Sequence, residues 1–118
     1  MSSFSDSRAD KVVNNFPGEW VNHNARHISR IYPAGKRVDS SNYDPNKGWN
    51  VGSQIVALNY QTPGTPMHLN DGKFRDNGGC GYLLKHPWLC DSRLRRMRKF
   101  NPATGPFPPG RTELTLEV

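Results

Sequence analysis

The strongest constraint on the fold is a short apolar run, Ile55-Val56-Ala57-Leu58, bounded on both sides by polar residues. A strand with one solvated face alternates apolar and polar residues, whereas an uninterrupted apolar run is typical of a strand buried on both faces. Such strands occur in parallel sheets covered by helices, so the run predicts an α/β fold. Residues 80–84 form a second run of this kind, which predicts another buried strand with Cys80 as a small core residue.

Residues 5–24 are predicted to be helical, because apolar residues recur there at three- and four-residue steps along one stripe. Its members are Ala9, Val12, Val13, Phe16, Trp20 and Val21. Pro17-Gly18 interrupts the stripe, which indicates two short helices or a kink rather than one straight rod. His23 and His27 stand four residues apart, the spacing of a metal-binding pair, although the sequence offers no evident third ligand.

Two side chains near the end of the next predicted strand, residues 28–32, carry a possible binding function. Pro33 closes this strand, and because side chains alternate in a strand, Arg30 and Tyr32 are expected to point to one face. A permanently charged guanidinium beside an aromatic side chain suits a ligand in which a ring carries an anionic group. The pair alone also fits a simpler hypothesis, in which the arginine of an edge strand packs its stem on the tyrosine.

The order of predicted elements fits part of an α/β barrel. Residues 39–50 are predicted to form a polar loop with one helical turn near Trp49, and residues 67–79 a loop rich in Asn, Asp and Gly. A complete (β/α)₈ barrel needs about 250 residues, roughly twice the 118 residues of this chain. We therefore expect half a barrel, whose open strand edges are completed by another segment.

The C-terminal part has a different character. Residues 101–110 contain four prolines and two glycines, which is typical of a linker. Leu114, Leu116 and Val118 then alternate with polar residues, as in the half-buried strand of a different domain. The sequence thus predicts a half barrel over residues 1–90, a linker over 91–112 and the start of a β-sandwich at 113–118.

Charge and cysteine content favour a cytoplasmic protein. The formal net charge is +6, and residues 93–99 contain five basic residues and no acidic one. This run suits contact with phosphates of nucleic acid or of an acidic membrane, or a solvated connector. No nucleic-acid recognition motif accompanies it, so no nucleic-acid partner is expected. No run approaches the ~20 apolar residues of a membrane span, and two cysteines form no disulfide framework.

Three long motifs identify a family resemblance: SRIYPAGKRVDSSNYDP, WNVGSQIVALNYQTPGTPMHLNDGKF and RDNGGCGYLLK. They resemble the Y region of eukaryotic phosphoinositide-specific phospholipase C, and the similarity runs from about Ser3 to Leu89. The tail resembles the family's link into a C2-type β-sandwich that binds lipid and calcium. The resemblance implies the C-terminal half of a distorted (β/α)₈ TIM barrel, followed by the linker and the first strand of that β-sandwich.

The resemblance also implies an activity in lipid signalling. The complete barrel hydrolyses phosphatidylinositol bisphosphate to diacylglycerol and inositol trisphosphate in a calcium-dependent reaction. By motif position, Ser3 would hydrogen-bond a ring phosphate, Arg30 would bind the 4-phosphate and Tyr32 would pack against the inositol ring. The catalytic histidines and the calcium ligands belong to the X half. This chain is therefore expected to contain no catalytic residue and no metal ligand, and to be inactive alone.

Some positions depart from common members of the family, among them Lys36, Asp10 and His86. Lys36 stands where several members carry a large apolar residue on a rim that faces the membrane. A lysine there implies attraction to anionic headgroups, worth about 1 kcal/mol and sensitive to salt. We expect a peripheral location at the inner membrane face. The alternative to an active phospholipase C is a fragment of a catalytically inactive relative. Such relatives keep the Y region and bind inositol phosphates or partner proteins.

Overall fold

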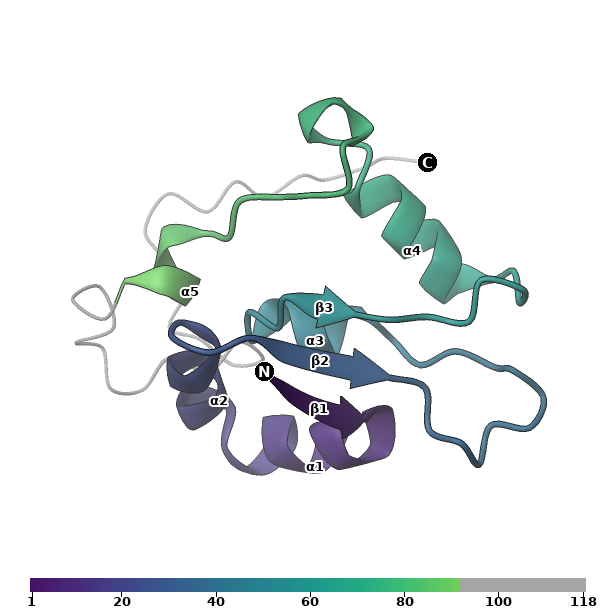
Figure 1. The fold of residues 1–118 in the computed structure, drawn as a ribbon, viewed down its shortest axis with the longest axis horizontal. Coiled ribbons are helices and arrows are strands. Elements are labelled where there is room, and N and C mark those ends of the chain that lie inside the picture. The colour runs from purple at the N-terminus through teal and green to yellow at the C-terminus, as the bar shows by residue number, and fades with distance from the viewer. Residues whose placement is uncertain (92–118) are drawn as a thin grey trace, which may run out of the picture.

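A three-stranded parallel sheet runs through the computed structural model, which describes residues 1–91 (Figure 1). The strands are β1 (Ser2–Ser5), β2 (Ser29–Tyr32) and β3 (Ile55–Val56), in the order β1-β2-β3. Both pairings are parallel, which confirms the predicted α/β class. Apart from Asp91, the predicted linker, the basic run and the β-sandwich strand lie outside the described residues.

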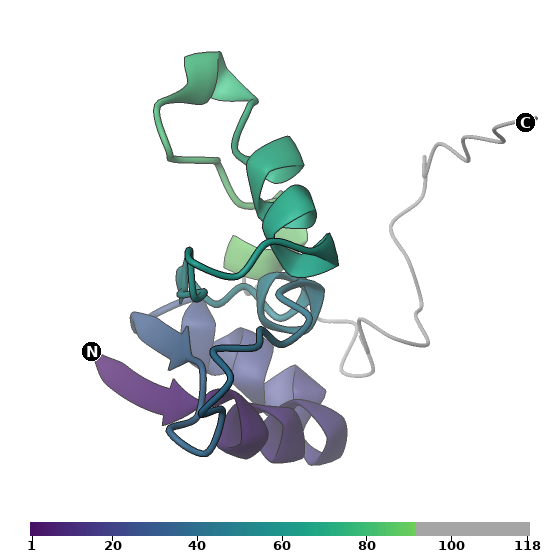
Figure 2. The ribbon, with the colours of Figure 1, turned by 90° about the vertical axis from the view of Figure 1, so that its right-hand side faces the viewer.

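Three helices lie on one face of the sheet and leave the other face open (Figure 2). These are α1 (Asp6–Asn15), α2 (Pro17–Asn24) and α3 (Asn46–Asn50). Phe16 leaves helical geometry with φ −137° and ψ 52°, and Pro17 begins α2 in its first turn, where its missing N–H costs nothing. The prediction of two short helices is confirmed, as is the helical turn at Trp49.

The core lies between the sheet and these helices. Trp20, Val21 and Val51 form its buried cluster, and the Phe4 ring packs edge-on against Trp20 with centroids 4.8 Å apart. Ile31, which is 2% exposed, points from β2 toward the same side. The burial of these side chains is the main stabilising term for the fold.

Asn24 is a buried polar hub in this core. It is 1% exposed, and its Nδ2 donates to the carbonyl oxygen of Val51 at 2.8 Å and to Ser53 Oγ at 3.2 Å. Its Oδ1 accepts a hydrogen bond from Ser29 Oγ at 2.5 Å. These bonds join the end of α2 to the start of β2 and to the segment before β3, and they satisfy polar groups that would be costly to bury unpaired.

Residues 67–79 are not a loop, as the sequence predicted: most of them form α4 (Thr65–Lys73) and the 3₁₀ turn η1 (Asn77–Gly79). Pro66 lies in the first turn of α4, where proline suits a helix, and Met67 is buried. The prediction failed because it took the Asn, Asp and Gly content as a loop signal. Asp71 and Gly72 are exposed on the helix, where such residues are tolerated at a modest cost. The short helix α5 (Pro87–Cys90) follows.

Both predictions of doubly buried strands were wrong. β3 contains two residues, and Ile55 is 41% exposed. Residues 80–84 form no strand: Cys80 is exposed, Tyr82 is 80% exposed and Leu84 is 99% exposed. Left-handed backbone at Asn77 and Gly78, with φ 56° and 67°, turns the chain before this run. The run then borders a groove beside β3 instead of pairing with it.

Candidate functional site at the strand ends

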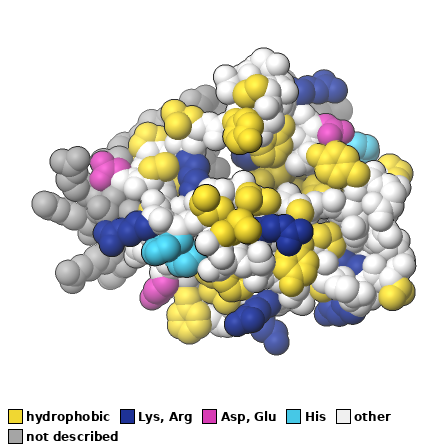
Figure 3. All heavy atoms as spheres, in the orientation of Figure 1, with side chains coloured by type: hydrophobic (Ala, Val, Ile, Leu, Met, Phe, Trp, Pro, Cys, Tyr) yellow, Lys and Arg dark blue, Asp and Glu magenta, His cyan; other side chains and the backbone are white. Residues whose placement is uncertain are grey.

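The open face of the sheet carries the three residues predicted to bind substrate. Ser3 pairs with Arg30 and Ser5 with Tyr32 in the parallel register, so these side chains share one face, while Ser29 and Ile31 are buried on the other. Figure 3 views this open face, where Lys and Arg side chains stand beside hydrophobic ones. The structure thus confirms that Arg30 and Tyr32 lie together, with Ser3 on the adjoining strand.

The guanidinium of Arg30 lies over the Tyr32 ring, with Cζ 4.9 Å from the ring centroid. This is a cation–π contact, which orients the planar fork and leaves its N–H groups available. The ion pairs within residues 1–91 join Arg37 to Asp6 and Lys47 to Asp10, and neither includes Arg30. Arg30 therefore presents an uncompensated positive charge on the open face, suited to an anion.

Asp6, which the sequence analysis overlooked, lies at the point where β1 gives way to α1. It is 4% exposed, and its Oδ1 accepts the N–H of Ala34 at 2.7 Å. Its Oδ2 accepts Nε of Arg37 at 3.2 Å and Nη2 at 2.6 Å. Burial raises the pKa of Asp6, but the hydrogen bonds from Arg37 and Ala34 and the charge of Arg37 outweigh it, so the pKa lies below its ordinary value.

The segment Asp39-Ser-Ser-Asn-Tyr43 fastens the loop after β2 to the exit of β3. The Tyr43 hydroxyl donates to the carbonyl oxygen of Ala57 at 2.8 Å. Asn42 and Asn59 exchange two hydrogen bonds, from Asn42 Nδ2 to the Asn59 carbonyl at 3.0 Å and from Asn59 N–H to Asn42 Oδ1 at 2.6 Å. Burial raises the pKa of Tyr43 well above its ordinary value, so the hydroxyl remains a donor at neutral pH.

The loop between β2 and Asn42 projects outward. Lys36 is exposed, and Val38 is 94% exposed. The Lys36 side chain makes no hydrogen bond or ion pair with any residue from 1 to 91. The predicted rim residue is thus exposed to solvent on the loop that follows β2.

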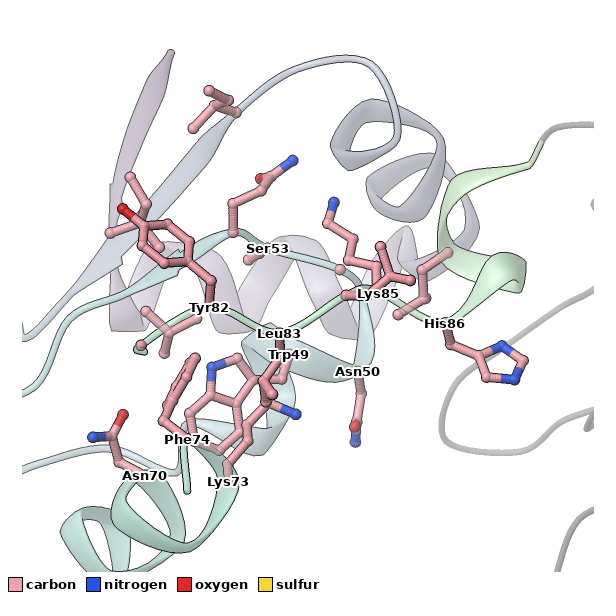
Figure 4. Close-up of a pocket in the computed structure, with 18 of the residues that line it drawn as sticks. Trp49, Asn50, Ser53, Asn70, Lys73, Phe74, Tyr82, Leu83, Lys85 and His86 are labelled. Carbon is pink, nitrogen blue, oxygen red and sulfur yellow. The ribbon is translucent and has the colours of Figure 1, made fainter. Parts of the chain in front are cut away.

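A groove of about 1350 Å³ lies beside β3, bordered by α3, α4 and residues 81–89 (Figure 4). Aromatic rings of Trp49 and Phe74 meet edge to face there, with centroids 6.0 Å apart, and Lys73 Nζ lies 4.9 Å from the Trp49 centroid. Neither Arg30 nor Tyr32 lines this groove. Its lining is mainly apolar, and it is separate from the pair formed by Arg30 and Tyr32.

The histidine pair stacks together with Trp20. His23 lies 4.8 Å from His27 and 5.6 Å from Trp20 between ring centroids, with near-parallel planes. Among residues 1–91, no group of three histidine, cysteine, aspartate or glutamate side chains is placed to hold a metal ion. In the same part of the chain, no helix is long and apolar enough to cross a membrane.

The chain is similar in sequence to known proteins. Residues 1–88 match the family described as phosphatidylinositol-specific phospholipase C, Y domain. The chain is 51% identical over 110 residues to human 1-phosphatidylinositol 4,5-bisphosphate phosphodiesterase delta-1, covering 91% of this chain and 14% of that protein. It is 43% identical to human inactive phospholipase C-like protein 1, covering 100% of this chain and 10% of that protein.

A solved phospholipase C structure is also similar to this chain in fold. The crystal structure of S. officinalis PLC21 superposes with a TM-score of 0.74 at 45% identity, covering 77% of this chain and 12% of that one. The chain thus spans about a seventh or less of the length of the relatives it matches. Because the family match covers most of the chain, the chain belongs to the phosphatidylinositol-specific phospholipase C family, of which it carries the Y domain.

Proposed function

We propose that this chain is the Y half of a barrel that hydrolyses phosphatidylinositol bisphosphate to diacylglycerol and inositol trisphosphate. The observation that carries this proposal is the Arg30 guanidinium, 4.9 Å above the Tyr32 ring on the face that Ser3 shares. Tyr32 is the last residue of β2, and Arg30 lies two residues before it. Active sites of α/β barrels are built at the C-terminal end of the strands.

In this proposal the chain binds the inositol phosphate part of the substrate. Arg30 offers two parallel N–H groups to the 4-phosphate, a geometry that phosphate oxygens accept well. Tyr32 packs against the inositol ring, and Ser3, the register partner of Arg30, donates to a ring phosphate. Binding in this manner orients the scissile phosphodiester toward groups that the other half of the barrel supplies.

We assign calcium to the X half of the barrel. Calcium takes six to eight oxygen ligands, with carboxylates prominent among them. The open face at Ser3, Arg30 and Tyr32 offers hydroxyls and a positive charge, which do not fit that ligand set. No step of the reaction is therefore derived through calcium bound to this chain.

The X half is also the proposed partner of the open strand edges. Within residues 1–91, β1 and β3 each pair on one side, with β2 alone. An unpaired edge presents free N–H and C=O groups and favours the addition of further strands. The mainly apolar groove beside β3 extends the surface that such a partner would cover.

We place the protein in the cytoplasm, peripherally at the inner membrane face, with Lys36 toward the lipid. Its exposed side chain lies on the loop that follows β2, at the same end of the strands as Arg30 and Tyr32. A lysine near an anionic leaflet contributes about 1 kcal/mol of attraction, which falls off within a Debye length.

A second candidate is a catalytically inactive protein that binds inositol phosphates or partner proteins. It is favoured by the 43% identity to a relative named as an inactive phospholipase C-like protein, over the whole of this chain. The two candidates place Arg30 and Tyr32 in the same role and differ in the X half.

Hydrolysis by the full-length protein separates the two candidates. The assay follows release of inositol trisphosphate from vesicles that contain phosphatidylinositol bisphosphate, with calcium and with a calcium chelator. Calcium-dependent release supports the enzyme. Absence of release combined with binding of inositol trisphosphate supports the inactive relative, and absence of both contradicts the proposed site.

A further inference from the structure

A buried carboxylate holds the first part of the loop at residues 33–42, which follows β2 and carries Lys36, while Asn42 and Asn59 hold its end. Asp6 accepts three hydrogen bonds from this loop, one from the Ala34 N–H and two from nitrogens of Arg37. Asp6 directly follows Ser5, the last residue of β1. The contact therefore joins the ends of the two adjacent strands that carry Ser3, Arg30 and Tyr32.

Arg37 is committed to this contact. Besides its two bonds to Asp6, its Nη1 donates to Ser41 Oγ at 3.1 Å and to the Asn42 carbonyl oxygen at 3.4 Å. Its side chain is 25% exposed, and its charge is compensated by the 2.6 Å ion pair with Asp6. The neighbouring Lys36 is exposed. Two adjacent cations that look equivalent in the sequence thus have different surroundings.

We infer that Asp6 is a positioning residue: its carboxylate fixes the loop at residues 33–42 to the end of β1, and Arg37 serves this contact instead of binding a lipid phosphate. Two hydrogen-bonded turns inside the loop make it rigid. In these turns the Arg37 N–H donates to the Ala34 carbonyl oxygen at 2.9 Å, and the Ser40 N–H donates to the Arg37 carbonyl oxygen at 3.0 Å. The tip then holds Lys36 outward, while β2 keeps Arg30 and Tyr32 in register with Ser3.

The effect on substrate recognition rests on the proposed function, whereas the effect on the loop does not. A small displacement of a binding group costs a large factor in rate when the site must hold its ligand in one geometry. Loss of the carboxylate should therefore reduce the preference for phosphatidylinositol bisphosphate over unphosphorylated phosphatidylinositol. A general loss of folded protein would reduce hydrolysis of both lipids by the same factor.

The test compares Asp6→Asn with Asp10→Asn in the full-length protein. Asp10 is a matched control, because it lies one helical turn further along α1 and forms an exposed ion pair with Lys47 at 3.3 Å. Hydrogen exchange of residues 33–42 is measured first. We expect at least tenfold faster exchange in this loop for Asp6→Asn, without a change in β2 and β3, and less than a twofold change for Asp10→Asn.

The second readout is the ratio of kcat/KM values for the two lipids. We expect this ratio to fall about tenfold in Asp6→Asn and to stay unchanged in Asp10→Asn. Unchanged loop exchange, or an equal loss on both lipids, would overturn the inference. If the wild-type protein does not hydrolyse lipid, the proposed enzyme fails, but loop exchange still decides whether Asp6 holds the loop.

A third variant keeps the inference testable if Asp6→Asn does not fold. Arg37→Lys retains the positive charge but loses the fork that makes two bonds to Asp6 and reaches Ser41 and Asn42. The same local increase in exchange is expected, at least threefold. Wild-type exchange in Arg37→Lys would contradict the assigned role of Arg37.

Discussion

Replacing Arg30 with alanine removes the charged fork from the open face while leaving the fold nearly intact. Arg30 is half-buried, and its guanidinium packs on the Tyr32 ring, with Cζ 4.9 Å from the ring centroid. A cation–π contact at an exposed site contributes about 0.5–1 kcal/mol. We therefore expect the free energy of unfolding to fall by no more than about 1 kcal/mol, measured by urea denaturation of the full-length protein.

The loss in catalysis should be larger and should depend on the lipid. A charge-assisted and partly desolvated pair with a phosphate contributes about 2–4 kcal/mol to transition-state binding. Because each 1.36 kcal/mol is a factor of ten in rate, kcat/KM for phosphatidylinositol bisphosphate should fall about 30- to 900-fold. Phosphatidylinositol has no 4-phosphate, so its hydrolysis should fall less than about threefold by the same reasoning.

Arg8→Ala is the matched control for this prediction. Arg8 also lies over an aromatic ring, with Cζ 5.7 Å from the Phe4 centroid. Phe4 alternates with Ser3 along β1 and packs into the core, so this pair lies away from the open face. Arg8→Ala should leave both lipids unaffected. An equal loss on both lipids for Arg30→Ala would refute the reasoning and show that Arg30 is structural.

Three further predictions concern the loop, the core and pH. Lys36→Ala should weaken binding to anionic vesicles about fivefold at low salt and have little effect at high salt, measured by vesicle sedimentation, because one lysine contributes about 1 kcal/mol. Asn24→Ala should lower the free energy of unfolding by about 2–4 kcal/mol, because it removes the partner of the Val51 carbonyl and of the Ser29 hydroxyl and leaves Ser53 Oγ with the Trp20 N–H alone; a loss below about 0.5 kcal/mol, as for a typical surface substitution, would contradict the role of Asn24. The pKa of Asp6 is lower in the folded protein, so its charge stabilises the fold above about pH 4, the unfolded value, and that contribution is lost as the pH falls through the folded pKa. Asp6→Asn should therefore flatten the acid limb of the stability curve, whereas an unchanged limb would show that Asp6 does not carry it.

The binding face was predictable because it depends on local periodicity. Alternation along residues 28–32 was enough to place Arg30 and Tyr32 on one face and Ile31 on the other, and the structure has both. The break at Pro17 was predictable for the same reason, since proline has no N–H and restricts its own φ. Local rules suffice where the structure is determined by neighbours in the chain.

The remaining features depend on partners far away in the sequence. Asp6 and Arg37 are 31 residues apart, and Asn42 and Asn59 are 17 apart, so no local pattern marks either pair. The apolar run at residues 80–84 was also predicted wrongly from local sequence. Its composition suits a strand, but the run pairs with no strand within residues 1–91 and Leu84 is 99% exposed, because composition alone does not determine pairing with a distant strand.

The most direct test of the central claim is a crystal structure of the full-length protein with inositol trisphosphate. We predict that the 4-phosphate lies within hydrogen-bond distance of the Arg30 guanidinium, that the inositol ring packs on Tyr32, and that a ring phosphate accepts a bond from Ser3. This outcome is expected for an active enzyme and for an inactive relative alike. A headgroup bound elsewhere, with Arg30 still stacked on Tyr32 and free of phosphate, would contradict the account.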